Sequence, residues 1–206
     1  MTIVLRSFAI LVIGLVVQSA WGQSSPSSAD ILQMLHPGGY VIVFRHGATY
    51  PDQADTDPLH DADVTKQRQL NDKGRTDAKE VAEALKAAGA PIGKLYSSRF
   101  YRAVETARLI GGREPEATLD LTEGGLVVSP NENNRRAQAF RAMVATVPDA
   151  GTNTLIVTHK PNILDVFGKD WFEVKEGEAS IFKPDGNGKY TLIARVQIGQ
   201  WTAAKK

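Results

Sequence analysis

The sequence predicts an α/β fold, in which short buried strands alternate with amphipathic helices. An apolar, β-branched run at Val41–Phe44 and a second at Thr154–Thr158 each have the composition of a buried strand. Between them, alanine, valine and leucine recur at helical spacing from Ala78 to Ala88, which predicts a helix from about residue 72 to Ala88. Strands that alternate with helices are typical of an α/β domain of this 206-residue size.

Two further segments complete the predicted elements. Residues 131–147 have helical spacing and are followed by a proline. Near the end of the chain, Glu178–Phe182 and Tyr190–Val196 flank a glycine-rich turn, which predicts a closing β-hairpin.

The amino terminus has the layout of a secretory signal peptide. Arg6 precedes a ten-residue apolar block, Phe8–Val17, and Ala20 and Gly22 are small residues suited to cleavage before Gln23. An uncleaved membrane anchor is the alternative, but the block is short for a span of about 20 residues. We therefore expect residues 1–22 to be removed, with no stable membrane insertion afterwards, and the protein to be periplasmic or secreted.

The remaining chain divides into a short leader and one domain. Residues 23–35 are expected to form a polar linker and a short helix capped by Ser28 or Asp30, and residues 36–206 the main domain. Loss of residues 1–22 removes Arg6 from 24 basic residues and none of the 23 acidic ones, so the net charge becomes zero. That balance does not favour nucleic acid as a partner. The absence of cysteine excludes disulfides and a lipid-modified cysteine.

The first strand is followed by residues suited to chemistry. Arg45 offers a planar fork of donors for phosphate or carboxylate, and His46 can act as base, ligand or nucleophile. Gly47 has no side chain, so a ligand could approach the backbone there. In α/β proteins, the carboxyl ends of strands open into the functional crevice.

Residues 51–69 form a polar stretch with several acids and His60. Their spacing fits neither a calcium loop nor a zinc site. We expect a solvated loop at the rim of the pocket, with no metal.

A second anion-binding pattern follows residue 92. A strand end at Ser97-Ser98 leads into a helix that carries Arg102, and free N–H groups at a helix start attract anions. The run V-F-R-H-G-A-T at 43–49, the run L-N-D-K-G-R-T-D-A at 70–78, and Ser98, Arg102-Ala103 and Thr106-Ala107 resemble the histidine phosphatase superfamily, branch 1, whose members are phosphoglycerate-mutase-like.

The resemblance implies a three-layer fold, with a mixed, mostly parallel sheet flanked by helices. It also implies that His46 becomes phosphorylated and that Arg45 and Arg102 bind the phosphoryl group together with a second histidine, His159, after the second strand. Arg99 stands where a proline is often found, and is either a third phosphate contact or a surface charge. The family's residues after this histidine often begin with glycine, whereas Lys160 stands here.

The proton donor is expected after the second helix. The family's Leu-x-Glu pattern falls on Leu121 and Glu123, without the longer stretch that usually follows it. Glu123 is therefore the first candidate, and Asp57, Asp165 and Glu178 are the alternatives.

The expected activity is that of an exported phosphatase without metal or cofactor. It would act on a small phosphorylated substrate or a phosphorylated envelope component. The alternatives are a mutase of the same family and a phosphate- or sugar-phosphate-binding protein without turnover. The natural substrate and the oligomeric state are open.

Overall fold

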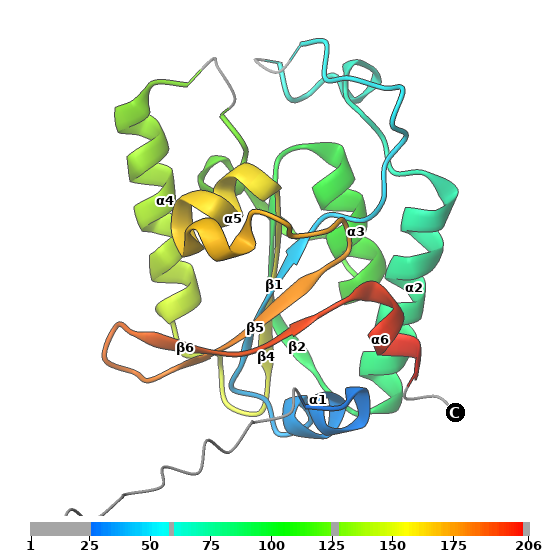
Figure 1. Cartoon of the computed structure of the whole chain (residues 1–206), viewed down its shortest axis with the longest axis vertical. Coiled ribbons are helices and arrows are strands. Elements are labelled where there is room, and N and C mark those ends of the chain that lie inside the picture. Colours follow the sequence, from blue (N-terminus) through cyan, green and yellow to red (C-terminus); the bar gives the residue numbers. More distant parts are fainter. Residues whose placement is uncertain (1–25, 58–59, 125–127, 204–206) are drawn as a thin grey trace, which may run out of the picture.

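The structure is a computed structural model that describes residues 26–57, 60–124 and 128–203 (Figure 1). Its helices are α1 (Ser28–Leu35), α2 (Asp72–Ala87), α3 (Tyr101–Gly111), α4 (Pro130–Ala145), α5 (Lys160–Phe167) and α6 (Ile198–Ala203). Its strands are β1 (Val41–Arg45), β2 (Ile92–Ser98), β3 (Glu116–Thr118), β4 (Asn153–Thr158), β5 (Ala179–Pro184) and β6 (Tyr190–Val196). Three 3₁₀ turns lie between them: η1 (Val64–Lys66), η2 (Leu119–Leu121) and η3 (Lys169–Trp171).

The described strands form one sheet in the order β3-β2-β4-β1-β5-β6. The first four are parallel, whereas β5 runs antiparallel to β1 and pairs with β6 as a hairpin. The expected mixed, mostly parallel sheet and its closing hairpin are therefore confirmed. The two helices predicted around residues 72–88 and 131–147 are present as α2 and α4.

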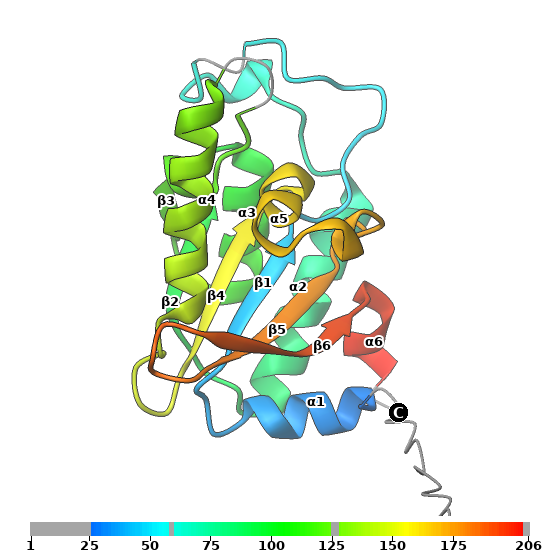
Figure 2. The same cartoon turned by 60° about the vertical axis from the view of Figure 1, so that its left-hand side comes forward.

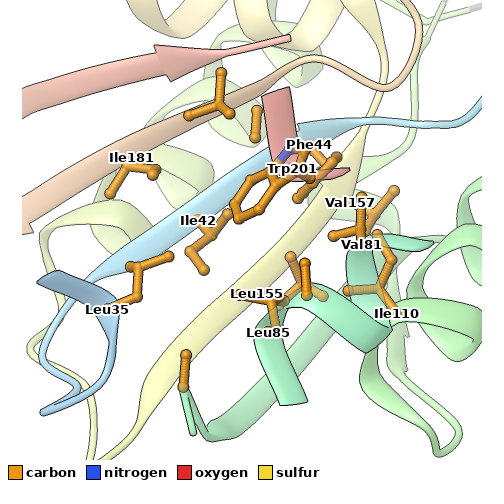
Figure 3. Close-up of a cluster of buried hydrophobic side chains, with 14 of the residues drawn as sticks. Leu35, Ile42, Phe44, Val81, Leu85, Ile110, Leu155, Val157, Ile181 and Trp201 are labelled. Carbon is orange, nitrogen blue, oxygen red and sulfur yellow. The ribbon is translucent and has the colours of Figure 1, made fainter. Parts of the chain in front are cut away.

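Each face of the sheet has its own hydrophobic core, because successive side chains of a strand point to opposite faces. Ile42 and Phe44 of β1 join the core under α1, α2, α3 and α6, where Phe44 stacks on Trp201 (Figure 3). Val41 and Val43 point the other way, into the core under α4 and α5. Strand β1 is thus buried on both faces of the sheet, which explains its nearly continuous apolar sequence.

Helix α1 is part of the folded domain and not of a linker. Ile31, Leu32 and Leu35 are buried in the core, and Asn153 Nδ2 of β4 donates to Leu35 O at 2.8 Å. The boundary expected at residue 36 therefore does not divide the structure. The expected cap is also corrected: Ser27 is the N-cap, since its hydroxyl accepts from Asp30 N and Asp30 accepts in return from Ser27 N.

The predicted signal peptide, residues 1–22, lies outside the described residues. Within the described part of the chain, no helix has both the length and the apolar character needed to cross a membrane.

The pairing register between β1 and β4 determines where the residues of the candidate site lie. Arg45 pairs with Thr158, so the residues that follow these strands leave the sheet side by side. Figure 2 shows both strands pointing to the same edge, below α5. The segment after β1 is then held on the start of α2, because Asn71 N donates to Ala48 O and Asn71 Oδ1 accepts from Gly74 N.

Gly74, in the first turn of α2, makes this close docking feasible. A Cβ at Gly74 would lie 2.2 Å from Ala48 O and 2.8 Å from Ala48 N, both backbone atoms. We predict that Gly74→Ala lowers the free energy of unfolding by about 1–3 kcal/mol, because this overpacking outweighs the roughly 1 kcal/mol gain in helix propensity. Urea unfolding of the purified protein measures the change.

The matched control is Gly199→Ala in α6, where the added Cβ would meet no atom within 4 Å. Its stability should match or slightly exceed that of the wild type. Equal stabilities for Gly74→Ala and the wild type would show that the docking of this segment on α2 is loose.

Candidate active site

Two buried histidines meet where β1 and β4 end. His46 follows β1 and His159 follows β4, and their side chains are almost fully buried. His46 N donates to Thr158 O at 3.0 Å, and the two ring centroids are 5.2 Å apart. The strand register thus converts a sequence separation of more than one hundred residues into direct contact.

The hydrogen bonding of His46 determines which ring nitrogen can react. Its Nδ1 lies 2.8 Å from Gly47 O, and a carbonyl oxygen only accepts hydrogen bonds. The proton of the neutral ring is therefore on Nδ1, and Nε2 carries the lone pair. Burial holds the pKa of His46 well below its ordinary value, and the positive charges of Arg102, Arg45 and Arg68 lower that pKa further. His46 is thus uncharged at neutral pH.

Arg45 and Arg102 are both held by oxygen atoms at this site. Arg45 Nη1 donates to Val174 O at 2.8 Å, and its Nη2 lies 3.5 Å from Glu176 Oε1. Glu176 also accepts from the backbone N and the hydroxyl of Thr49, which follows the same strand.

Arg102 is fully buried at the start of α3. It donates to Asp55 Oδ1 at 2.8 Å through Nη1 and to Glu123 Oε1 through Nη2. Its guanidinium carbon also lies 4.7 Å from the ring centroid of Phe100, a cation–π contact. Arg102 thus takes its position from one acid before α2, one acid after β3 and the aromatic ring at its own helix cap.

The third cation is Arg68 and not Arg99. Arg68 Nε is buried without a hydrogen-bond partner among the described residues, and the charge of Arg68 lowers the pKa of both His46 and His159. The side chain of Arg99 is 46% exposed and its Nη1 lies 3.7 Å from Asp61 Oδ2. Of the two alternatives for Arg99, the structure therefore agrees with a surface charge. We call His46, His159, Arg45, Arg68 and Arg102 the histidine–arginine cluster.

Protein atoms pack against Gly47 on both sides. Its N–H donates to Thr106 Oγ1 at 3.0 Å, and a Cβ at this position would lie 3.1 Å from Gly74 O. The expectation that Gly47 lets a ligand approach is corrected accordingly: the missing side chain lets α2 approach. Thr106 in turn donates to Arg102 O, which links Gly47 to the helix that carries Arg102.

Of the four acids considered from the sequence, Glu123 is the one that the described structure brings to the histidine–arginine cluster. Its Oε1 contacts Arg102 and lies 3.5 Å from His159 Nδ1. Thr158 Oγ1 donates to Leu121 O at 2.6 Å, which fixes the Leu121–Glu123 segment at the end of β4.

The other three acids have different partners. Asp57 pairs with His60, and Asp165 accepts from Asn133 in a groove of about 430 Å³ between α4 and α5. Glu178 is buried, where it accepts from Arg195 and Gln197. These contacts give Glu178 a structural position beside the closing hairpin.

The cluster contains nitrogen atoms that the described residues leave without hydrogen bonds. They are Nε of Arg45, Arg68 and Arg102 and Nδ1 of His159, all buried. Three guanidinium groups and a histidine with buried, unpaired nitrogens form a suitable set for a tetrahedral oxyanion. The described residues contain no group of three or more His, Cys, Asp or Glu arranged to hold a metal ion.

Sequence reasoning missed three residues of this site. Asp55 and Arg68 come from the stretch expected to be a solvated loop, where Asp55 Oδ1 accepts from Arg68 N as well as from Arg102. Glu176 follows η3 in a segment with no recognised pattern. None of them falls within a strand or motif that the sequence predicts, and their positions depend on how long segments fold back over the sheet edge.

Comparison with known proteins agrees with this geometry. Residues 41–126 match the family model for the histidine phosphatase superfamily, branch 1. A search of curated proteins found no match.

Several solved phosphatases share the fold at low sequence identity. The protein histidine phosphatase SixA complexed with tungstate is 19% identical, with a TM-score of 0.56 over 78% of this chain and 97% of that one. A variant of phosphoserine phosphatase from Entamoeba histolytica, complexed with phosphoserine, is 17% identical, with a TM-score of 0.52 over 78% and 98%. The α-ribazole phosphatase from Shigella flexneri is 17% identical, with a TM-score of 0.52 over 74% and 94%.

The family predicted from the sequence motifs is thus confirmed by the family model, and the expected fold by these structures. The family match covers residues 41–126, and the fold shared with these phosphatases covers 74–78% of the chain.

Proposed function

We propose that this protein is a phosphatase that hydrolyses phosphomonoesters through a phosphohistidine on His46. The observation that carries the proposal is a buried, neutral His46 whose Nδ1 donates to Gly47 O, so that Nε2 is free to attack beside three arginines. Arginine charge both binds the phosphoryl oxygens and keeps the nucleophile unprotonated. The match of residues 41–126 to a phosphatase superfamily supports the same reaction.

In the first step, Nε2 of His46 attacks phosphorus and the bond from phosphorus to the leaving oxygen breaks. Arg45, Arg68 and Arg102 stabilise the charge on the phosphoryl oxygens, which accounts for most of the catalysis expected in phosphoryl transfer. The proton on Nδ1 stays on the ring, held by Gly47 O. Once the phosphoryl group has displaced Glu123 from Arg102, its carboxylate takes up a proton from solvent and then gives that proton to the leaving oxygen.

In the second step, water attacks the phosphorus of phosphohistidine and the phosphorus–nitrogen bond breaks. Glu123, now a carboxylate, takes the proton from that water. The products are inorganic phosphate and His46 with its lone pair restored. These residues supply the nucleophile, the charge stabilisation and the proton transfers of both steps, so the proposed reaction does not require a metal ion.

The first test removes the nucleophile. His46→Ala should lower phosphate release by at least about 10³-fold, because the covalent route loses the atom that attacks. Rapid quench of the wild type with a ³²P-labelled substrate should show an acid-labile label on the protein, which His46→Ala should lack.

His60→Ala is the matched control, since His60 pairs with Asp57 at the surface. It should keep both turnover and label. Full turnover by His46→Ala would contradict the proposal. Phosphate binding without turnover in the wild type would favour the non-catalytic binding protein, and transfer between hydroxyl groups without phosphate release would favour the mutase.

The second test concerns Glu123. Glu123→Gln should slow phosphorylation of His46 by an alkyl phosphate about 10²- to 10⁴-fold, because an alkoxide leaves poorly without a proton. Phosphorylation by p-nitrophenyl phosphate should slow far less, because nitrophenolate leaves readily. Rapid quench measures this step separately from hydrolysis of the phosphoenzyme.

Asp57→Asn provides the comparison, because Asp57 was an alternative donor and is paired with His60. In this variant, either substrate should phosphorylate His46 at about the wild-type rate. If Glu123→Gln leaves the alkyl ester unaffected while Asp57→Asn slows it, the proton comes from Asp57.

We also propose that the phosphatase acts outside the cytoplasm, as the layout of residues 1–22 suggests. Its substrate would then be a small phosphorylated compound or an envelope component. Intact-mass measurement of protein recovered after export from a Gram-negative host should show a chain that starts near Gln23. A mass that includes residues 1–22 would support a retained anchor.

A further inference from the structure

The second histidine has a hydrogen-bond partner at one ring nitrogen and none at the other. Nε2 of His159 lies 2.7 Å from Ser98 Oγ, at the end of the neighbouring strand β2. Its Nδ1 faces Glu123 Oε1 at 3.5 Å and has no hydrogen bond within the described residues. Burial first, and then Arg102, lower the pKa of His159, so the ring is neutral and carries a single N–H.

The surroundings of Ser98 determine where its hydroxyl proton goes. Ser98 Oγ accepts from Phe100 N at 3.1 Å, so its proton is directed to another acceptor. The two candidates are His159 Nε2 at 2.7 Å and Thr122 Oγ1 at 3.3 Å. Hydroxyl hydrogen bonds are usually 2.5–3.0 Å long, so the contact with Thr122 is too long for a good one.

The distance to His159 also favours the hydroxyl as donor. A value of 2.7 Å is typical of O–H donors, whereas N–H donors centre on 2.9–3.0 Å. Thr122 does not need the proton of Ser98, because its hydroxyl donates to Thr118 O and accepts from Arg99 N. Thr122 is thus satisfied by the backbone, and Ser98 is held at the ring.

We propose that Ser98 donates its hydroxyl proton to Nε2 of His159 and thereby fixes this histidine in the tautomer with its N–H on Nδ1, directed to the phosphoryl site. Ser98 is a positioning residue, since it acts through His159. In the other tautomer, Nδ1 would present a lone pair to the Glu123 carboxylate or to a bound phosphate, and would repel either. The part that concerns phosphate rests on the proposed function; the assignment of the tautomer does not.

The tautomer can be measured in the wild-type protein. Long-range ¹H–¹⁵N correlation spectra of histidine-labelled protein at pH 7.5 distinguish a protonated ring nitrogen from an unprotonated one. His159→Gln removes the His159 signals and so assigns them. We expect Nδ1 to be the protonated nitrogen and Nε2 the unprotonated one; protonated Nε2 would overturn the proposal.

Ser98→Ala should shift the His159 population towards the tautomer with its N–H on Nε2. It should also weaken binding of inorganic phosphate by tenfold or more, the change expected for one lost hydrogen bond to a charged group. Ser98→Thr, which keeps the hydroxyl, should restore both properties towards the wild-type values.

Ser97→Ala is a closely matched control. Ser97 is also fully buried at the end of β2, but its hydroxyl has no partner within the described residues. This variant should leave the His159 spectrum and phosphate affinity unchanged. Identical His159 spectra for Ser98→Ala and the wild type would contradict the role of Ser98.

The readouts separate this inference from the proposed function. A wild type that shows the expected tautomer but releases no phosphate from any ester would refute the phosphatase and leave the role of Ser98 intact. A working phosphatase whose His159 carries its proton on Nε2 would refute the inference alone.

Discussion

The parallel pairing of β1 with β4 is the constraint on which the rest of the site depends. It sets Arg45 opposite Thr158, and so delivers His46 and His159 to the same edge of the sheet. A shift of one residue would send every side chain of β1 to the opposite core, and Phe44 would lose its stacking on Trp201. The positions of the two histidines are thus protected by the burial of Val41 to Phe44.

Carboxylates from outside the strands stabilise the buried positive charges of the site. Arg45 faces Glu176, and Arg102 lies between Asp55 and Glu123. A buried cation without a partner would cost several kcal/mol, so these acids offset a large penalty while they orient the guanidinium groups. A phosphoryl group that enters the cluster must replace part of this pairing. Glu123 contacts both Arg102 and His159, so it is the acid that an entering phosphoryl group would displace.

The predicted strands, helices and motifs accounted for the fold and for most of the residues of the site. His46, Arg45, His159 and Arg102 were predictable because each immediately follows or ends an apolar strand, or begins the helix after one. Arg68 could not be predicted in the same way. It precedes α2 in a polar stretch with no periodicity, and reaches the site because Gln67 and Asp55 anchor that stretch to Tyr101 N and Arg102.

The same limit applies to Arg99 and Gly47. The sequence left Arg99 as either a third phosphate contact or a surface charge, and the structure pairs Arg99 with Asp61, whereas Arg102 is buried. The lack of a side chain at Gly47 was attributed to ligand approach, whereas the close neighbour is Gly74 of α2. Sequence shows that space is needed at a position, but only the packed structure shows which group occupies it.

The two histidines share an environment yet are suited to opposite tasks. Both are buried beside the same arginines and both are held neutral, so electrostatics alone would treat them alike. The difference lies in one hydrogen bond each. His46 faces a carbonyl that can only accept, which leaves a lone pair on Nε2 for attack. His159 faces a hydroxyl that can donate, and in the proposed tautomer this leaves an N–H on Nδ1 for the phosphoryl oxygen. In the proposed reaction, a backbone carbonyl and a serine hydroxyl would thus give two similar rings the separate roles of nucleophile and hydrogen-bond donor.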